Sequence, residues 1–251
     1  MKKNDLSSKT RIIMALLGCM AFLFTFFGCR HGYTALPVDQ KIIALTFDDG
    51  PNPLYTPKVL EILEEHDIKA TFFVIGRKAQ ASPEIVRNIK AAGHEIENHS
   101  WSHLFWLSSL TPQKIEKEIC ATQDIIFNIT GEYPAFFRAP FGWTSDQLFI
   151  SCQKLSLPVM DGSIKPGDTA MPGKDNIVSS ILRRADPGAI IILHDGGGFW
   201  FYKNRSQTLE ALPEVIQGLK DRGYTFVTIK ELFDYHIKSA RSPIIHKATF
   251  Y

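Results

Sequence analysis

Two adjacent aspartates stand where an apolar segment meets a turn. Asp48 and Asp49 follow the strand-like residues 41–47 and precede Gly50-Pro51, a pair typical of turns. Neighbouring strand residues face opposite ways, but a sharp turn can bring both carboxylates into one site. One carboxylate could then bind a metal ion while the other acts as a base. The alternative is an aspartate that only stabilises the turn.

Two histidines separated by three residues are candidate metal ligands. His99 ends the strand-like residues 94–99 and His103 follows it, and the two share one face if a helical turn begins there. Imidazole is the commonest metal ligand, and Asp49 would complete a set of two histidines and one carboxylate. Such a set leaves one position open for water, as in catalytic zinc sites. Asn98 could orient one of these ligands by a hydrogen bond.

A second class of enzyme uses the same ligands. Non-haem Fe(II) oxygenases also bind their metal through two histidines and one carboxylate. The alternation of strand-like and helix-like segments and the additional Asp48 argue against this class.

An arginine ends another apolar segment. Arg138 closes residues 135–138, and beside two aspartates its guanidinium could hold the base Asp48 in place. Asp168, in the loop after residues 157–160, is the predicted partner of Arg138. Taken alone, either residue is equally consistent with an ordinary edge or turn position.

A histidine ends the apolar residues 189–194. His194 stands next to Ile192 and Leu193, where it could donate a proton to a leaving group. A lone histidine at a strand end is more often structural. The combination with three other charged strand ends favours catalysis.

These side chains must be positioned by the alternating elements of the chain. A helix beginning at Thr111-Pro112 carries isoleucines along one stripe, as an amphipathic helix does. The strand-like segments are apolar, which indicates a sheet covered on both faces. They comprise residues 41–47, 70–76, 94–99, 135–138, 157–160, 189–194 and 225–229.

This alternation predicts the fold class. Strands followed by helices imply right-handed crossovers and a parallel sheet. About seven such units fit the chain, which predicts an α/β fold with barrel-like closure. Because chemistry gathers at the C-terminal strand ends of such folds, the charged residues should meet in one site.

The composition is that of a globular protein. Hydrophobic residues make up 45% and charged residues 22% of the 251 residues, which excludes a largely disordered chain. The formal net charge is +2, and its excess comes from the N-terminus, where Lys2, Lys3, Lys9 and Arg11 oppose Asp5 alone. No basic face for nucleic acid is predicted in the remainder.

Residues 1–29 are predicted to be a leader. Residues 12–28 form an uncharged run after a basic segment, as in secretory signals, and they are at the short limit for a membrane span. Cys29 follows Gly28 in a sequence that resembles a bacterial lipoprotein cleavage box. A lipid anchor at Cys29, an uncleaved membrane anchor and a cleaved signal all remain open. Each of them predicts an exported protein, either membrane-anchored or periplasmic or extracellular.

The exported part is predicted to contain one domain. Residues 30–40 are expected to form a tether, residues 41–236 the domain and residues 237–251 a C-terminal tail. Cys120 and Cys152 could form a disulfide, which export permits, or remain free thiols.

Four motifs together resemble the polysaccharide deacetylase family, the NodB-homology domain of carbohydrate esterase family 4. They are TFDDGP (46–51), HSWSH (99–103), RAPFG (138–142) and LHD (193–195), in the family's order and approximate spacing. The resemblance covers about residues 40–235. It implies a distorted (β/α)7-type barrel and the metal-dependent removal of N- or O-acetyl groups from sugars.

The resemblance implies a role for each matching residue. Asp48 matches the catalytic base, Arg138 the residue that orients this base, and His194 the general acid. The matching metal ligands are Asp49, His99 and His103.

The resemblance also implies contacts with the substrate. Phe141 stands where the family usually has tyrosine, whose backbone N–H helps to bind the oxyanion, and Ile192 matches the apolar wall for the acetyl methyl group. Leu193 is expected beside this wall. Trp200, in the aromatic residues 199–202, could stack on a sugar ring or pack as a plug.

The fourth motif of the family is only partly present. Asp168 matches its later aspartate, but Thr169 replaces a tryptophan and Lys165 an earlier aspartate. These departures concern the groove wall and the choice of substrate more than the chemistry.

The predicted function is metal-dependent removal of N-acetyl groups from an extracytoplasmic glycan, foremost peptidoglycan. Zinc is the predicted metal, and cobalt, nickel or manganese would fit the same ligands. Chitin oligosaccharides and O-acetylated xylan are alternative substrates. A non-catalytic carbohydrate-binding domain is the alternative from another class.

Overall fold

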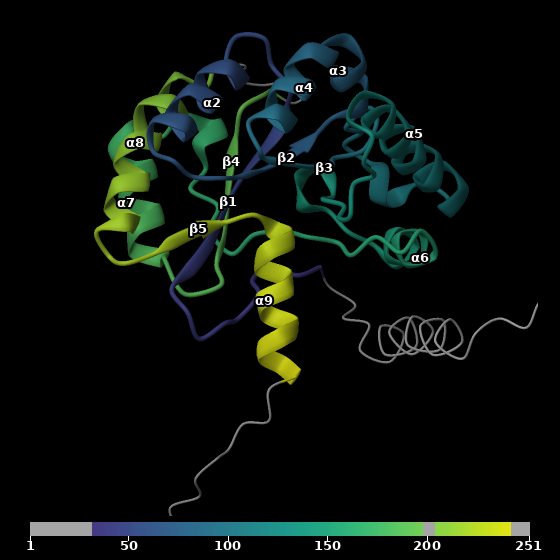
Figure 1. Cartoon of the computed structure of the whole chain (residues 1–251). Helices are drawn as coiled ribbons and strands as arrows, with labels where there is room; N and C mark the ends of the chain where they lie inside the picture. The colour runs from purple at the N-terminus through teal and green to yellow at the C-terminus, as the bar shows by residue number, and fades with distance from the viewer. Residues whose placement is uncertain (1–31, 198–203, 242–251) are drawn as a thin grey trace, which may run out of the picture. The chain divides into compact units, whose positions relative to one another are not determined.

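The computed structural model describes residues 32–197 and 204–241 (Figure 1). The predicted leader with Cys29 lies outside the described residues, as does Trp200 with its aromatic neighbours. Within the two described ranges, no helix is long and apolar enough to cross a membrane.

The described strands form a parallel sheet in the order β3-β2-β1-β4, with β5 also paired to β1 (Figure 1). β5 pairs with the first residues of β1, whereas β2 pairs with its later part. The strands are β1 (Ile42–Gly50), β2 (Thr71–Val74), β3 (Glu95–Asn98), β4 (Ile190–His194) and β5 (Thr225–Val227).

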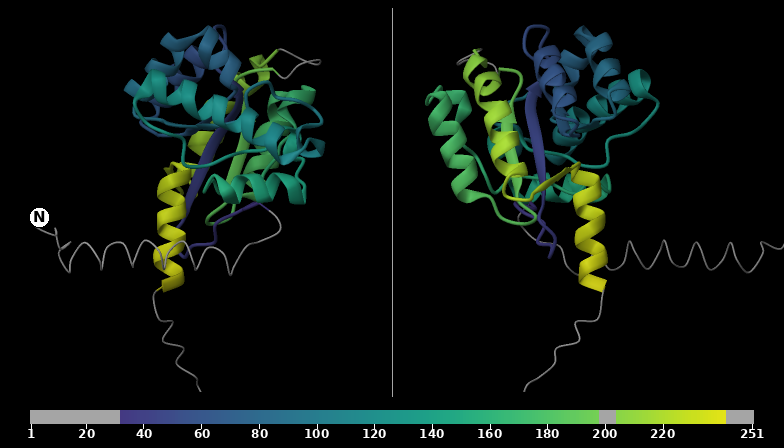
Figure 2. Two further views of the ribbon diagram at one scale, coloured as in Figure 1. Left: turned by 90° about the vertical axis from the view of Figure 1, so that its right-hand side faces the viewer. Right: turned by 60° about the vertical axis from the view of Figure 1, so that its left-hand side comes forward.

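Helices cover this sheet. α7 and α8 lie side by side on one flank, and α3, α4 and α5 pack together on another (Figure 2). The described helices are α2 (Thr56–Glu65), α3 (Gly76–Ala81), α4 (Pro83–Ala91), α5 (Pro112–Thr130), α6 (Asp146–Lys154), α7 (Lys174–Arg184), α8 (Ser206–Lys220) and α9 (Ile229–Arg241).

Local sequence explains where several helices begin and end. Pro83 and Pro112 open α4 and α5, because proline suits the first helical turn, where its missing N–H has no partner to bond. At the start of α6, the Ser145 hydroxyl oxygen accepts the Leu148 N–H. α5 ends at Gly131, whose φ of 77° is the left-handed conformation that glycine adopts most easily.

The core lies on both faces of the sheet. Every residue of β1 is buried, because one face of the strand packs against the helices and the other against residues inside the barrel. The rings of Phe47 and Phe72 stack at 5.1 Å between β1 and β2. The predicted stripe of α5 is confirmed, because Ile115, Ile119 and Ile126 are buried. The predicted α/β class with a parallel sheet is therefore confirmed.

The barrel closes through isolated bridges rather than through further strands. Residues 135–138 and 157–160, expected to be strands, make only single bridge pairs, which link Phe137 to Asn98 and to Val159. Pro158 contributes to this outcome, because it has no N–H to extend a ladder. A further bridge pairs Ile164 with Ile191 of β4, which completes the circle of strands. The barrel is accordingly distorted on this side.

The predicted tether is partly wrong. Tyr33 and Ala35 form bridges to Met160 and Ala189, and Leu36 is completely buried. These apolar residues fill one end of the barrel, so the folded part begins before residue 41. At the other end of the domain, α9 runs beyond residue 236 to Arg241.

The two remaining cysteines are free thiols. Cys120 is partly exposed, whereas Cys152 is buried and its pKa is raised to about 12 by that burial. The alternative of a disulfide between them is therefore not realised.

The parallel arrangement brings the charged strand ends to one edge. Asp48 on β1 is the register partner of His194 on β4, and Asn98, which precedes His99, pairs with Val74 of β2. The C-terminal ends of these four strands therefore carry the site.

Candidate active site

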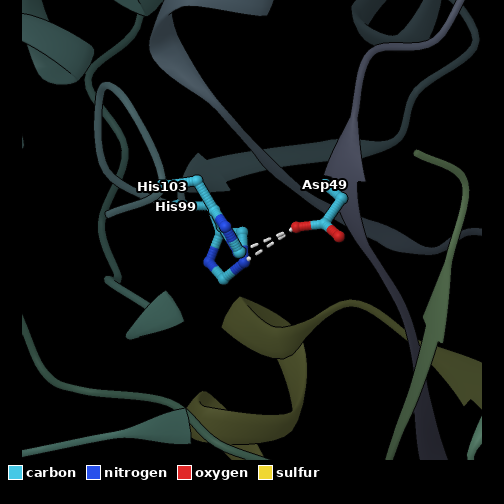
Figure 3. Close-up of side chains that lie close together, drawn as sticks. All are labelled: Asp49, His99 and His103. Atoms are coloured by element: carbon cyan, nitrogen blue, oxygen red, sulfur yellow. Dashed lines mark ion pairs between the residues drawn. The ribbon is translucent and has the colours of Figure 1, made fainter. Parts of the chain in front are cut away.

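The predicted metal ligands converge. Asp49 Oδ1 lies 3.0 Å from His103 Nε2 and 3.5 Å from His99 Nε2 (Figure 3). One potential ligand atom from each residue falls within 4.8 Å of the others, and all three side chains are buried. Residues from the end of β1 and from the loop after β3 thus form one cluster.

A bulge at the end of β1 explains how both aspartates face the site. Asp48 pairs with Phe73 and Gly50 with Val74, so Asp49 is an extra residue in the ladder. Its φ of 72° is left-handed, which turns its side chain away from the ordinary strand alternation. This is the sharp turn that the sequence predicts.

The two histidines lie on a bend, not on the expected helical turn. Ser100 and His103 have φ values of 62° and 54°, which no right-handed helix contains. Asn98 Oδ1 accepts the Ser100 N–H at 2.9 Å, and Ser100 Oγ accepts the His103 N–H at 3.1 Å. Asn98 therefore shapes the loop that carries the ligands, rather than contacting a ligand as predicted.

The orientation of His99 is set by a backbone carbonyl. His99 Nδ1 lies 2.9 Å from the Arg138 carbonyl oxygen, to which it donates. This bond places the proton on Nδ1 and leaves the Nε2 lone pair free for a metal.

The cluster fits a divalent cation. Burial raises the pKa of Asp49, but the neighbouring His103 and His99 outweigh it and hold this pKa well below the usual value. Within the described residues, Asp49 Oδ1 is buried without a hydrogen-bond partner of good geometry. A buried carboxylate oxygen that faces two imidazole nitrogens is a position that a metal would satisfy. The family that the sequence resembles is metal-dependent, which agrees with this fit.

The other aspartate, Asp48, is fixed by an arginine. Arg138 Nη1 donates to Asp48 Oδ1 at 2.6 Å and to Thr46 Oγ1 at 2.7 Å. Nε and Nη2 donate to the carbonyl oxygens of Met160 and Asp161. The guanidinium also lies 3.8 Å from the centre of the Phe73 ring. Arg138 thus holds Asp48 as the sequence predicts.

The predicted partner of Asp168 is wrong. Its carboxylate accepts the His194 N–H and contacts His194 Nδ1, both at 2.9 Å, and it accepts the Thr208 hydroxyl at 3.0 Å. Gly167, with a left-handed φ of 75°, begins a short 3-10 helix that turns Asp168 under the end of β4. The donors of Arg138 meanwhile serve Asp48, Thr46 and two carbonyls.

This pairing changes the acidity of both residues. Burial lowers the pKa of His194, but the charge and hydrogen bond of Asp168 outweigh it and raise this pKa to about 9. Burial raises the pKa of Asp168, but His194 and Thr208 outweigh it and lower this pKa. His194 is therefore an imidazolium at neutral pH, as an acid must be.

These groups open into a cleft of about 1060 Å³. Ile192, His194 and Phe141 line it together with both aspartates and both metal-ligand histidines. Leu193, predicted to contact the substrate, is instead completely buried in the core. Its neighbours on β4 face the cleft, and adjacent strand residues point to opposite faces.

Other residues that support the site were not predicted from the sequence. Thr46 anchors Arg138 and lies two residues before Asp48, on the same face of β1, which the two-residue period could have indicated. Lys78 Nζ donates to the carbonyl oxygens of Asp49 and Gly197, both at 2.7 Å. Nothing in the sequence near Lys78 indicates this contact.

Asp195, the last residue of the LHD motif, also has a structural contact. Its carboxylate accepts the Thr56 hydroxyl at 2.5 Å, which links the end of β4 to the start of α2. Burial raises the pKa of Asp195 to about 6. Asp195 therefore supports the end of β4.

Comparisons with known proteins agree with this geometry. A family model described as polysaccharide deacetylase matches residues 35–159. A peptidoglycan-N-acetylglucosamine deacetylase of Bacillus cereus is 39% identical over 202 residues, which cover 80% of this chain and 92% of the relative. A chitooligosaccharide deacetylase of Bradyrhizobium is 38% identical over 221 residues, covering 85% of this chain and 100% of the relative.

A solved structure has the same fold. The crystal structure of a peptidoglycan N-acetylglucosamine deacetylase with a bound N-oxidanyl-benzamide superposes with a TM-score of 0.75 at 30% identity. The match covers 80% of this chain and 92% of that chain.

Proposed function

Because this chain belongs to the polysaccharide deacetylase family and is an amide hydrolase of N-acetylated sugars, we propose that peptidoglycan is its substrate. The reaction would cleave the acetamide bond of N-acetylglucosamine or N-acetylmuramic acid units. The products are a free amino sugar and acetate. The names of several relatives support this substrate.

One observation carries the catalytic proposal. Asp48 is a buried carboxylate outside the metal ligand set, held at 2.6 Å by Arg138 and paired in register with His194 across β1 and β4. A base and an acid therefore stand on adjacent strand ends beside the ligands. Hydrolysis of an amide needs both groups.

The proposed metal is zinc, held by Asp49, His99 and His103. When bound there, a divalent cation acts as a Lewis acid on the acetyl carbonyl and lowers the pKa of water. Cobalt, nickel or manganese would suit the same two imidazoles and one carboxylate.

The chain's own residues perform the proton transfers. Asp48 accepts a proton from the attacking water, while Arg138 keeps the carboxylate in place. The Phe141 N–H donates to the oxygen that gains negative charge. The His194 imidazolium then donates its proton to the leaving nitrogen as the C–N bond breaks, and Asp168 holds the ring in the orientation that this transfer requires.

Chitin oligosaccharides are the second candidate substrate. Three relatives between 38% and 39% identical are named chitooligosaccharide deacetylases. Both substrates present N-acetylglucosamine, so the same acid and base would serve. O-acetylated xylan is a further alternative, since one relative is named a bifunctional xylanase/deacetylase. The complete acid–base set argues against a purely carbohydrate-binding role.

We place this activity outside the cytoplasm. The basic and apolar residues 1–29 support export, and Cys29 supports a lipid anchor. Fractionation of cells that carry the wild type or Cys29→Ala tests the anchor. Release of the variant from the membrane is expected, and unchanged membrane retention would favour an uncleaved anchor instead.

Acetate release from peptidoglycan, chitin oligosaccharides and acetylated xylan tests the substrate. Peptidoglycan is expected to give the highest kcat/KM, and release from xylan alone would contradict the proposal. Metal analysis of the purified protein belongs to the same experiment. His99→Ala is expected to lose the metal, and unchanged metal content would refute this ligand.

A further inference from the structure

A lysine from a neighbouring helix holds the backbone of a metal-ligand candidate. Lys78 lies in α3, and its Nζ donates to the carbonyl oxygen of Asp49 at 2.7 Å. The same ammonium group donates to the carbonyl oxygen of Gly197, also at 2.7 Å. Lys78 therefore joins three segments that are distant in the chain, namely α3, the end of β1 and the loop after β4.

The Asp49 carbonyl oxygen is the atom through which Lys78 can act on the ligand set. Asp49 has a left-handed φ of 72°, which is unfavourable for a residue that carries a Cβ atom. Such a conformation persists only where the surrounding structure fixes it. A hydrogen bond to this carbonyl restricts rotation about the bond between the Asp49 Cα atom and the carbonyl carbon. The contact with Lys78 thus helps to set the direction of the Asp49 side chain.

The contacts between the bulge and the chain after β4 are weaker than those of Lys78. The ladder between β1 and β4 ends at Asp48 and His194, one residue before the ligand. Beyond it, the N–H groups of Asp195 and Gly196 reach the Asp48 carbonyl oxygen only at 3.3 and 3.4 Å, which is long for a hydrogen bond. The two shorter bonds of Lys78 therefore hold the bulge where the ladder to β4 has ended.

The direction of the Asp49 side chain decides whether the three ligands can share one ion. Figure 3 shows the carboxylate directed at His99 and His103, with Oδ1 at 3.5 and 3.0 Å from their Nε2 atoms. A metal requires its ligand atoms at defined distances and angles. Removing a group that holds a metal ligand in place typically weakens metal binding by about 10–100-fold.

The charge of Lys78 has the opposite effect. A cation near a metal site repels the metal, so the loss of this charge alone would strengthen metal binding. The Asp195 carboxylate attracts the Lys78 ammonium and offsets its charge. The loss of position is therefore expected to outweigh the loss of repulsion.

We propose that Lys78 is a positioning residue, which fixes the backbone of Asp49 and thereby strengthens metal binding by Asp49, His99 and His103. This inference rests on the metal site of the proposed function. It gives Lys78 no contact with the substrate or with the reacting atoms. Variants of Lys78 should therefore change the affinity for the metal more than the KM for the glycan.

Calorimetric titration of the metal-free protein with Zn²⁺ measures this affinity. Lys78→Met removes both donated hydrogen bonds and is expected to weaken zinc binding about 10-fold. Lys78→Arg keeps the charge and the donors, so it should recover most of the affinity. Lys69→Met is the matched control, because Lys69 precedes β2 and its Nζ also donates to a backbone carbonyl oxygen, that of Ala92. The control should bind zinc as the wild type does.

Thermal melting of the metal-free proteins separates positioning from a purely structural role. A purely structural contact would lower the melting temperature of Lys78→Met but leave the zinc affinity of the folded protein unchanged. Equal zinc affinities of wild type and Lys78→Met, or tighter binding by the variant, would overturn the proposal. If Lys78→Met did not fold, Lys78→Gln, with a shorter and uncharged donor, should still bind zinc more weakly, and equal affinity there would overturn the proposal as well.

Failure of the proposed function gives a different result. If the wild type bound zinc but released no acetate from any glycan, the proposed function would fail, yet the zinc titration would still decide the role of Lys78. A wild type that bound no zinc would overturn the proposed metal site together with this inference.

Discussion

Two carboxylate–cation pairs flank the metal ligands, and they differ in the cation. Asp48 is paired with Arg138, a side chain that keeps its charge at every pH at which enzymes work. Asp168 is paired with His194, whose charge depends on pH. The first pair is almost completely buried, whereas the His194 side chain is 22% exposed to the cleft.

The difference shows how one residue type takes two roles in one site. A permanent cation fixes the position of Asp48 without giving or taking a proton, so Asp48 is free to act as the base. Asp168 instead raises the pKa of its partner to about 9 and so keeps the partner able to donate a proton. The predictions below test this division between the two pairs.

The largest effect is expected from removing the base. Asp48→Asn keeps the shape and the hydrogen bond acceptor but cannot take a proton, so kcat should fall by roughly 10²–10⁴-fold. Metal content should stay that of the wild type, because Asp48 is not a ligand. Steady-state kinetics and elemental analysis check both, with the exposed Asp175→Asn as the control. Near-normal turnover would remove Asp48 from the base role.

The next effect concerns stability. Arg138→Met leaves the buried Asp48 carboxylate without its cation, so the free energy of unfolding should fall by about 3–5 kcal/mol. The double variant Asp48→Asn/Arg138→Met should be less destabilised than Arg138→Met alone, because the unpaired charge is gone. Denaturant unfolding measures all three proteins. A double variant that is as unstable as the single one would contradict the buried-pair argument.

The pair of Asp168 and His194 should control how kcat depends on pH. Asp168→Asn removes the charge that raises the pKa of His194, so the basic limb of the kcat profile should move to lower pH. At pH 8 the rate should fall roughly tenfold, since each pKa unit changes the protonated fraction by up to that factor. A basic limb in the same place as in the wild type would show that Asp168 does not control His194.

The same pair has a signature in the stability of the metal-free protein. Because the pKa of His194 is about 9 in the folded state and near 6.5 when unfolded, the pair stabilises the fold fully below about pH 6.5. This contribution is lost as the pH rises from about 6.5 to about 9. Asp168→Asn should remove that pH dependence, which denaturant unfolding of both proteins across this pH range measures.

The smallest effect is expected from Thr208, whose hydroxyl donates to the Asp168 carboxylate. Thr208→Val removes one hydrogen bond to the Asp168 carboxylate, which is worth about 1 kcal/mol. The basic limb should move far less than in Asp168→Asn, because the Asp168 carboxylate keeps its charge and its contact with His194. A larger shift than that of Asp168→Asn would mean that Thr208 acts on His194 by another route.

Residue types and their order in the chain predicted which residues form the site, but they did not predict all of the pairings between those residues. Asp49, His99 and His103 converge as expected, because parallel strands place their C-terminal ends at one edge. The partner of Asp168 was not predictable, since Gly167 and a short 3-10 helix decide where that loop turns. The path of such a loop depends on its local backbone angles, and the alternation of residues in strands does not indicate these angles.

The fold was predictable where strands are continuous. β1 and β4 were predicted closely, whereas residues 135–138 and 157–160 have strand-like composition but make only bridges. The prediction that Leu193 contacts the substrate was wrong, and strand alternation could have corrected it, because Ile192 had already been assigned to the cleft wall. The contact of Lys78 could not be predicted, because a lysine on a short helix gives no sign that its ammonium group reaches the Asp49 carbonyl oxygen at the end of β1.

The burial of Arg138 has a consequence for how the enzyme responds to heat. Its side chain is 2% exposed and lies against Phe73, which belongs to the hydrophobic core. The part of the site that holds the base therefore cannot loosen while the interior stays packed. Heat inactivation and cooperative melting should follow the same curve, with no temperature interval in which a folded domain has lost its turnover.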